Sequence, residues 1–529
     1  MIGYHITTIC IANSKGDICQ GAGDRYAYLD WLLDDHPDEE PKVFYDLDAS
    51  VAALLKLMGI GKHDAERLSR NRKLYMAPYR LTYYPGRFFS IDRGFGPEHP
   101  YVNFSNMGQY TDVHFEPEPS PQYAVKKARE AEEIGQEVAR AFKRLGLDDK
   151  RLTSPIGAFD RSHSKATDIP TLDDIPVEAA EIAYGCVKGN WLEAYQLGYW
   201  KEAYDYDISG AYGSELAKLL DLRRGRWLRT PNCPNGAAYG FAKGNITCWA
   251  DFHPFLLNVS EDMTYTPVGT WPTNLTMQEI AFLEKWNLGK FEIEDAWWWI
   301  PEGKQNELLK GMIKWLWEKR RNTEEIDNKV VKRIMAGIWG RTLEVRGTEA
   351  EPEFGPHVNP VYGAIVESNT RLRVADTCLE HCIVPLHVAV DGMILDKLVP
   401  IDGTGGLGDW RLSHVGQCII ASSGVVAFEG KAGAEEFSLR FSWLQDQMER
   451  YPRDREYEMR KYSPCSLARA LNTDFDKLGM IEEITRSVAI GGESKRMWRD
   501  HPRNGGDLLK RKFQSAPWEY GVIKQEIQV

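Results

Sequence analysis

The sequence lacks the patterns that mark several protein classes. None of its apolar runs approaches 18 residues, so we expect no transmembrane helix and no membrane association. Its start, MIGYHITTICIANSKGD, lacks the basic and long apolar parts of a signal peptide. It has nine cysteines, an odd number without a Cys-x-x-Cys pair, and no internal repeat or low-complexity tract. These absences, in a chain of 529 residues with 43% hydrophobic residues, predict a reduced, cytoplasmic, multidomain globular protein.

Positive charge is scarce overall but clustered. The net charge is −12, with an acidic excess in residues 33–48. Separate basic groups on an acidic chain are typical of a protein that holds a polyanion along a channel. Any one of these groups taken alone is better interpreted as a solvated helix face. The groups are Arg223, Arg224, Arg226 and Arg229; Lys319, Arg320, Arg321, Lys329, Lys332 and Arg333; and Lys495, Arg496, Arg499, Arg503, Lys510, Arg511 and Lys512.

Two aspartates carry the strongest chemical signal. Asp207 ends a short alternating stretch that runs into a helix, in YDYDISGAYGSELAKLL, and Asp391 interrupts a β-rich run, LHVAVDGMILDK. A basic stretch expected to form two helices, residues 303–342, lies between them. Two strand-borne carboxylates can hold divalent cations, and the basic helices can neutralise a polyphosphate. The pattern predicts metal-assisted phosphoryl transfer from a nucleotide. The alternatives to metal binding are a helix N-cap for Asp207 and an Asp-Gly hairpin turn for Asp391.

The first motif, DISGAYGS (residues 207–214), resembles the first palm motif of family B DNA polymerases, Asp-x-x-Ser-Leu-Tyr-Pro-Ser. The resemblance is greatest to compact phage-encoded members, and it covers nearly the whole chain in the right order. It implies that Asp207 is a catalytic metal ligand and that Tyr212 packs under the incoming sugar and excludes a 2′-hydroxyl. Gly213 stands where the family usually has proline, which loosens the turn without removing chemistry.

The second motif, KRIMAGIWG (residues 332–340), resembles the fingers-helix motif Lys-x-x-x-Asn-Ser-x-Tyr-Gly. By this resemblance Lys332 contacts the incoming triphosphate, Trp339 lies near the nascent base pair, and Gly340 allows close backbone approach. Alanine and glycine replace the usual Asn-Ser pair. Arg320 is the expected second phosphate ligand, with Lys319 and Arg321 as competitors. A lone lysine such as Lys332 is more often simply solvated.

The third motif, VAVDGMIL (residues 388–395), resembles the hairpin motif Tyr-Gly-Asp-Thr-Asp-Ser. Asp391 aligns with the second aspartate, the catalytic one that ligates metal together with Asp207. Ala389 replaces the first aspartate, the less essential of the two. Further on, SKRMW (residues 494–498) resembles the basic-aromatic thumb motif that grips the primer terminus. Lys495 and Arg496 are therefore the expected DNA-binding residues.

The N-terminal region resembles the family's exonuclease domain in outline, but its acids are missing. The first strand has no Asp-x-Glu pair, and Lys127 occupies the place of the third-motif aspartate. Asp48 alone remains from the second motif, and one carboxylate cannot organise two metals. We therefore expect a ribonuclease-H-like domain that has lost proofreading and serves as a structural platform for template or partner contacts.

The resemblance implies an α+β multidomain fold, in which a right-hand polymerase with palm, fingers and thumb follows the N-terminal domain. It also implies Mg²⁺, with Mn²⁺ as an alternative, and as partners a DNA template-primer, deoxynucleoside triphosphates and phage or host replication accessory proteins. The expected parts are an exonuclease-like domain (1–165), a connector (166–200), palm (201–302 and 343–433), fingers (303–342) and thumb (434–529).

Other functions stay open from the sequence alone. A template-independent nucleotidyltransferase on the same scaffold would need only a nucleotide, and a nuclease would need neither nucleotide nor template. A catalytically inactive DNA-binding relative would use none of them. The primer type and the role of the tryptophan run at residues 297–299, which is core or a stacking platform for bases, are left undecided.

Overall fold

The structure is a computed structural model of the chain. No helix among the residues that it describes is long and apolar enough to cross a membrane. The described residues are 1–21, 24–34, 41–94, 100–111, 113–117, 119–147, 152, 154–163, 168–260, 263–321, 325–348, 351–401, 403–431, 441–451, 456–490, 495–500 and 507–527.

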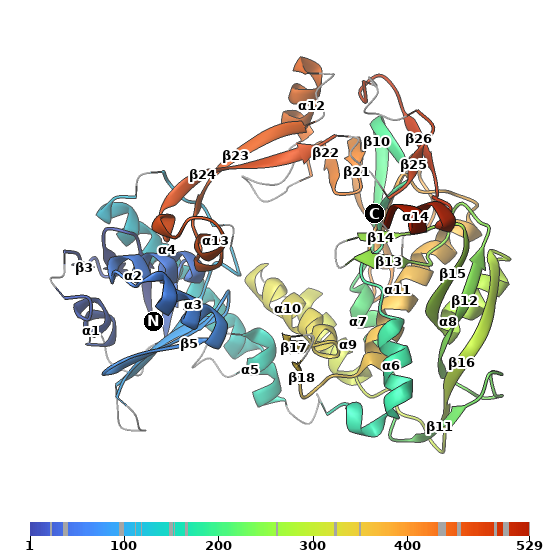
Figure 1. The fold of residues 1–529 in the computed structure, drawn as a ribbon, viewed down its shortest axis with the longest axis horizontal. Helices are drawn as coiled ribbons and strands as arrows, with labels where there is room; N and C mark the ends of the chain where they lie inside the picture. Colours follow the sequence, from blue (N-terminus) through green and yellow to red (C-terminus); the bar gives the residue numbers. More distant parts are fainter. Residues whose placement is uncertain are drawn as a thin grey trace.

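The N-terminal domain is built on an eight-stranded sheet with helices packed against it (Figure 1). Strand β1 pairs in parallel with β4, and β4 with β8, while the other pairs are antiparallel. The sheet order is β3-β2-β1-β4-β8-β7-β6-β5. The strands are β1 (Ile2–Ile6), β2 (Ile11–Asn13), β3 (Ile18–Cys19), β4 (Lys42–Phe44), β5 (Lys73–Met76), β6 (Tyr79–Tyr84), β7 (Phe88–Arg93) and β8 (Tyr101–Asn106). The helices are α1 (Ala27–Asp34), α2 (Leu47–Leu57), α3 (Lys62–Asn71), α4 (Pro121–Arg144) and α5 (Pro155–Ser162).

Helix α4 is the long helix predicted from the stretch YAVKKAREAEEIGQEVARAFKRLG. Ser120 caps it by accepting a hydrogen bond from the Tyr123 amide, and Pro121 occupies its first turn. Its small residues let it pack closely on β1, because a side chain at Gly3 would collide with the backbone of Ala128. This packing fixes the position of Lys127, which is central to the site discussed below.

A second, central sheet joins strands from distant parts of the sequence. Its order is β22-β21-β10-β20-β19-β9, and β26 pairs with β10 and with β25. The strands are β9 (Leu192–Ala194), β10 (Gln196–Ile208), β19 (His387–Ala389), β20 (Gly392–Leu395), β21 (Trp410–Ser422), β22 (Val425–Phe428), β25 (Met497–Trp498) and β26 (Phe513–Ala516). Thus β9 and the start of β10 lie in the stretch predicted as a connector, and β26 in the one predicted as thumb.

One face of the central sheet is covered by helix α11 (Pro360–Glu380). Successive side chains on a strand point to opposite faces. Tyr206 and Ile208 of β10 therefore pack into the same core as α11 residues such as Val374, while Asp205 and Asp207 face the other side. The central sheet thus presents alternating carboxylates on one face and an apolar core on the other.

A four-stranded sheet, β11-β16-β12-β15, lies beside the central sheet. Trp298 and Trp299 on its strand β16 are 1% and 0% exposed, so these two tryptophans are core residues. The strands are β11 (Gly225–Arg229), β12 (Tyr239–Cys248), β15 (Gly269–Thr276) and β16 (Gly289–Pro301). Near it are the hairpin of β13 (Leu257–Ser260) and β14 (Met263–Tyr265) and the helices α6 (Val177–Gly185), α7 (Ala211–Leu216), α8 (Met277–Lys285) and α14 (Tyr520–Ile527).

The predicted pair of helices between the two aspartates is confirmed. Helix α9 (Lys310–Arg321) and helix α10 (Glu325–Arg341) pack against each other and against α7. Most of the predicted polar turn between them lies outside the described residues. A short hairpin of β17 (Val345–Thr348) and β18 (Glu351–Phe354) follows α10.

The C-terminal part differs from its helical and irregular prediction, because a long hairpin dominates it. Strands β23 (Glu456–Pro464) and β24 (Ile481–Ala489) pair only with each other. Helix α12 (Phe441–Arg450) precedes the hairpin, and helix α13 (Leu467–Asn472) lies between its strands. In Figure 1 the hairpin runs from the central sheet across to the N-terminal domain.

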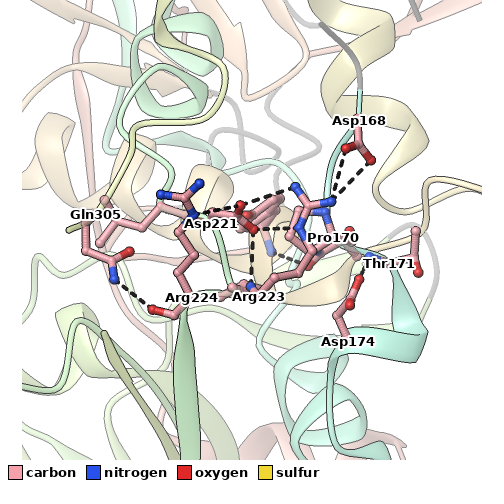
Figure 2. A network of polar contacts seen from close by, with 12 residues as sticks. Asp168, Pro170, Thr171, Asp174, Asp221, Arg223, Arg224 and Gln305 are labelled. Carbon is pink, nitrogen blue, oxygen red and sulfur yellow. Dashed lines mark hydrogen bonds and ion pairs between the residues drawn. The ribbon is translucent and has the colours of Figure 1, made fainter. Parts of the chain in front are cut away.

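Ion pairs of Arg223 connect the segment around Asp168, which precedes the central sheet, to Asp221. Arg223 bridges Asp168 and Asp221, with Nη1 3.2 Å from each Asp168 oxygen and Nε 2.8 Å from Asp221 Oδ1 (Figure 2). Gln305 donates a hydrogen bond to the Arg224 carbonyl oxygen from the other side. Two arginines of the first basic group, Arg223 and Arg224, therefore serve this network.

Candidate active site

Asp207 and Asp391 meet at the end of the central strands. Asp207 lies directly opposite Gly392 of β20 and Arg411 of β21. Asp391 occupies the tight turn between β19 and β20, and its carbonyl oxygen accepts a hydrogen bond from the Ile208 amide at 2.9 Å. The residue before it, Val390, has φ of +59°, a conformation that costs a β-branched residue about 1–3 kcal/mol. The Asp-Gly hairpin turn, which the sequence offered as an alternative to a metal site, therefore places Asp391 beside Asp207.

The electrostatics show that the two carboxylates interact. Burial raises the pKa of Asp391, the neighbouring Asp207 raises it further, and Lys332 opposes the shift. The charge of Lys332 on α10 therefore reaches Asp391, while its predicted contact with a triphosphate stays a prediction. The negative charge of this pair is the kind of field that a divalent cation relieves.

Arg411 forms an ion pair with Asp207 in this structure. Its guanidinium makes a bidentate ion pair, with Nε 3.1 Å from Oδ1 and Nη2 2.8 Å from Oδ2. Both carboxylate oxygens of Asp207 are thus already paired, so Arg411 has to turn away before Asp207 ligates a metal. Sequence reasoning missed Arg411, because its partner is 204 residues away.

The two aspartates line a cavity of about 650 Å³ that opens on the face of the central sheet. Asp205, two residues before Asp207, lines it too, accepts a hydrogen bond from Ser413 Oγ at 3.0 Å and pairs with Lys431. Arg486 from the long C-terminal hairpin reaches the same cavity. The sequence hinted at Asp205 through the Asp-x-Asp spacing on one strand, but Lys431 and Arg486 carried no signal.

The helical hairpin supplies the aromatic side of the site. The rings of Tyr212 and Trp339 lie 4.6 Å apart between centroids, tilted by 48°. Burial raises the pKa of Tyr212, with Asp391 among the charges that add to the shift. Gly340 follows Trp339 on α10, and a Cβ there would meet nothing within 4 Å. The structure thus brings Tyr212 and Trp339 of the two motifs together, while the contacts with sugar and base that the motifs predict stay predictions.

Arg320 is separated from its two competitors by its surroundings. Its guanidinium lies 5.4 Å from the Trp317 ring centroid and donates from Nε to Asn328 Oδ1. Burial lowers the pKa of Arg320, as does Arg411, while Asp207 raises it. Lys319 instead lies over Trp315, and Arg321 is exposed at the end of α9. The charge of Arg320 is therefore coupled to that of Asp207.

No family model matches the sequence, and no curated protein matches it either. Solved structures do match. Phi29 DNA polymerase in a ternary complex with primer-template DNA and incoming nucleotides aligns over 93% of this chain and 99% of its own, with a TM-score of 0.60 and 11% identity. The same polymerase with single-stranded DNA aligns over 92% and 99%, with a TM-score of 0.59 and 11% identity.

The chain has the fold of phi29 DNA polymerase. This fold comprises an exonuclease-like N-terminal domain followed by palm, fingers and thumb. In the order of these parts along the chain, we use the name palm for the central sheet, fingers for α9 and α10, and thumb for the region of the β23–β24 hairpin. The predicted fold class is confirmed, while the residue boundaries assigned to each part remain predictions.

One predicted DNA contact has to be corrected. Arg496 is only 3% exposed and makes a buried ion pair with Glu193, with Nη1 2.8 Å from Oε1. It also donates to Ser515 Oγ at 2.8 Å, and its guanidinium lies over Tyr195. Because these partners use its charge inside the palm, Arg496 is not available to a DNA phosphate in this structure.

Lys495 remains compatible with its predicted role. It is half-buried, and its ammonium donates to the Leu192 carbonyl oxygen at 3.1 Å. The two adjacent residues of the expected motif thus have different surroundings. Arg496 is paired inside the palm, and Lys495 lies nearer the surface. The basic cluster in the sequence could not reveal this division, because Glu193 lies 303 residues upstream.

The centre of the exonuclease-like domain holds a cation among aromatic rings. Lys127 is 7% exposed, donates to Tyr45 Oη at 3.2 Å and lies over the rings of Tyr45 and Tyr123. His5 on β1 packs edge-on against the same two rings, and burial followed by the Lys127 charge lowers its pKa to about 3. Asp48 is used elsewhere, since it accepts hydrogen bonds from Tyr83 Oη and the Gly86 amide. Lys127 also makes an ion pair with Glu130, with Nζ 2.8 Å from Oε2, so the place of the third-motif aspartate is taken by a lysine whose charge is paired.

Proposed function

We propose that this protein is a DNA-directed DNA polymerase that adds deoxynucleotides to a primer 3′-hydroxyl and has no proofreading. The observation that carries the proposal is the meeting of Asp207 and Asp391 opposite Lys332 and Arg320, on the fold of a DNA polymerase. The proposed partners are template-primer DNA and deoxynucleoside triphosphates, the molecules present in the solved phi29 ternary complex.

The donor set suits Mg²⁺ or Mn²⁺. The described parts of the chain contain no cluster of three or more His, Cys, Asp or Glu side chains able to hold a metal. Mg²⁺ is commonly held by one or two carboxylates, with waters and substrate phosphates completing its shell. Asp207 and Asp391 fit that arrangement. When bound there, divalent cations would polarise the α-phosphate and stabilise the attacking and leaving oxygens.

The chain's own residues would position the reactants. Lys332 and Arg320 would neutralise charge that develops on the leaving pyrophosphate. Tyr212 and Trp339 form an aromatic wall against which sugar and base can pack. Arg411 would release Asp207 as the substrate's own charges arrive. Binding and orientation of the two substrates then provide the rest of the catalysis.

The absence of proofreading rests on the exonuclease-like centre. Hydrolysis of a phosphodiester by metal ions needs carboxylates to hold them. The buried group at that centre is Lys127, whose neighbours are His5, Tyr45 and Tyr123, and the nearby carboxylate of Glu130 is already paired with the Lys127 ammonium. These residues support a structural role for the domain.

The test is extension of a labelled primer on a template, with Mg²⁺ and each deoxynucleotide added separately. We expect addition of the template-dictated nucleotide, which Asp391→Ala abolishes. Asp396→Ala is the matched control, because Asp396 is an exposed aspartate directly after the end of β20 and its replacement should leave extension unchanged. Addition that ignores the template would indicate a template-independent nucleotidyltransferase. No addition by folded protein with either metal would overturn the proposal.

A further inference from the structure

Helix α10 of the fingers lies between two parts of the molecule (Figure 1). On one side it packs against α4 and α5 of the N-terminal domain, and on the other against α7 and α11 beside the central sheet. Gly337 and Arg341 lie about one turn apart on one face of the helix. Lys332 and Trp339, about two turns apart, lie roughly half a turn around the helix from them. The two faces of α10 therefore have different neighbours.

A buried ion pair joins the start of α10 to the N-terminal domain. Asp327 is 1% exposed, and Arg144 at the end of α4 donates to both of its carboxylate oxygens, with Nε 2.8 Å from Oδ2 and Nη2 2.5 Å from Oδ1. Further along α10, Val330 and Ile334 are 0% exposed and share a hydrophobic core with Phe142 of α4. Removing one partner of a buried ion pair is strongly unfavourable, so this contact fixes the first turns of α10 against α4.

The middle of α10 is held by the residues that follow β8. Lys329 donates a hydrogen bond to the Tyr110 carbonyl oxygen at 3.3 Å, and Arg333 donates to the Gln109 carbonyl oxygen. The Arg333 guanidinium lies 5.5 Å from the centroid of the Tyr110 ring, and Tyr110 is 2% exposed. Two of the cations that the sequence groups with Lys332 thus contact the N-terminal domain.

The end of α10 fits closely against α5. A Cβ added to Gly337 would lie 2.9 Å from Ile156 Cβ, so the backbone of α10 approaches the side chain of α5 directly. Arg341, in the last turn of α10, forms an ion pair with Asp160 of α5. The N-terminal domain therefore contacts α10 from its first turn to its last.

The other face of α10 carries the residues predicted to bind the nucleotide. Lys332 opposes the raised pKa of Asp391, and the Trp339 ring lies 4.6 Å from the Tyr212 ring between centroids. Both residues belong to one helix, so a shift of α10 against the N-terminal domain displaces them together. A misplacement of about 1 Å at a distance from the chemistry can lower a reaction rate by about a hundredfold.

We propose that the N-terminal domain is a brace that positions α10 for the incoming nucleotide, with Arg144 and Ile156 as positioning residues. The inference rests on the proposed polymerase function, which supplies the nucleotide. Among the described residues that line the cavity with Asp207 and Asp391, none takes part in the contacts between α10 and this domain. The brace therefore acts through the position of α10, and the domain that lacks nuclease acids contributes to nucleotide addition.

A methyl group added at the contact tests the brace. Gly337→Ala places this group against Ile156 and should raise the KM for the incoming nucleotide by about ten- to a hundredfold, because it displaces α10. The Kd for template-primer should be unchanged. Gly311→Ala in α9 is the matched control, since a Cβ there would meet nothing within 4 Å, and it should leave the KM unchanged. Equal KM values for the two variants would overturn the brace.

A second substitution shows whether the effect passes through the N-terminal domain. Ile156→Gly removes the side chain that opposes the added methyl group. The rise in KM caused by Gly337→Ala should therefore be smaller in an Ile156→Gly background than in the wild-type background. The same rise in both backgrounds would show that residue 337 acts on the nucleotide directly, which would overturn the brace.

Hydrogen exchange separates the brace from the polymerase function, because it needs no activity. Arg144→Met should speed the exchange of the α10 amides at least about tenfold, since it leaves Asp327 buried without its partner. Arg140→Met is the control, because Arg140 is an exposed arginine one turn earlier on α4. Circular dichroism checks that both variants fold.

The two measurements together distinguish the outcomes. Nucleotide addition by the wild type, with unchanged exchange in Arg144→Met and an unchanged KM in Gly337→Ala, overturns the brace alone. Faster exchange in Arg144→Met, with no addition by the wild type, supports the attachment of α10 to the N-terminal domain and overturns the polymerase. Unchanged exchange and no addition overturn both proposals.

Discussion

The two polar centres of this molecule have opposite chemistry. In the palm, Asp207 and Asp391 lie close enough to raise a pKa, and cations surround them. In the exonuclease-like domain, Lys127 sits at the centre and depresses the pKa of His5. The first centre lies at the end of central-sheet strands, whereas the second lies between helix α4, which carries Lys127, and strand β1, which carries His5. The comparison teaches that two sheet domains of one chain can carry opposite side-chain chemistry, a pair of carboxylates in one and a buried lysine among aromatic rings in the other.

The largest expected effect separates the two centres. Asp207→Asn and Asp391→Asn should each lower nucleotide addition by more than about a hundredfold, because each removes a negative charge from the group that would hold metal. Lys127→Met should leave the rate of addition unchanged. Single-turnover extension measures all three, and a drop of similar size in Lys127→Met would break the comparison.

A large effect on stability is expected from the ion pair inside the palm. Arg496→Ala should lower the free energy of unfolding by about 3–5 kcal/mol, because it leaves the Glu193 carboxylate buried without its partner. Burial alone would raise the pKa of Glu193, but Arg496 and hydrogen bonds lower it overall. The ion pair is therefore intact at neutral pH and lost as the pH falls through that lowered pKa.

Urea unfolding measures this loss, and Lys495→Ala is the neighbouring control. Lys495 is half-buried and should change stability little while weakening DNA binding in a salt-dependent way. If Arg496→Ala were as stable as wild type and weakened DNA binding instead, the assignment of Arg496 to the palm interior would be wrong.

A moderate effect on nucleotide binding is expected at the fingers. Lys332→Ala should raise the KM for the incoming nucleotide and lower kcat/KM by about ten- to a hundredfold, because it removes a positive charge that faces the triphosphate. Lys329→Ala on the same helix is the control, since Lys329 instead pairs with Glu325 and the Tyr110 carbonyl oxygen. Equal effects of the two substitutions would show that the positive charge of this helix acts as a whole and that Lys332 has no specific contact with the triphosphate.

The smallest expected effect is a change in the pKa of Asp391. The pKa of Asp391 is raised by burial and by Asp207 and is held down by Lys332. In metal-free protein Asp391 should therefore keep its proton to a higher pH than an exposed aspartate, and Lys332→Met should extend that range upward. Carboxyl-carbon NMR titration follows this directly. A downward shift in Lys332→Met would show that Lys332 does not face Asp391.

Local sequence signals predicted the parts of the site that come from short segments. Asp207 follows an alternating strand, Asp391 sits in an Asp-Gly turn, and the basic helical pair lies between them, as the structure shows. The long-range partners were beyond prediction. Arg411 and Arg496 look like surface cations in the sequence, and only the register of β10 with β21 and the folding of residue 193 onto residue 496 reveal their roles.

The thumb hairpin was missed for a different reason. Strands β23 and β24 carry charged residues on much of their length and few buried ones, so they lack the apolar alternation that marks a half-buried strand. Their partner is each other, and their anchor is the distant α2. The docking of the thumb tip is a tertiary contact that no local pattern encodes.

The contrast between the two centres is tested most directly on one primer with a matched or a mismatched 3′ end. Wild-type protein is incubated with 5′-labelled primer-template and Mg²⁺, with and without deoxynucleotides. We predict that the matched primer is lengthened and that neither primer is ever shortened. Lengthening that Asp391→Asn abolishes would place the chemistry in the palm. Shortening of the mismatched primer by purified protein, retained in Asp391→Asn and lost in a Lys127 variant, would contradict the account.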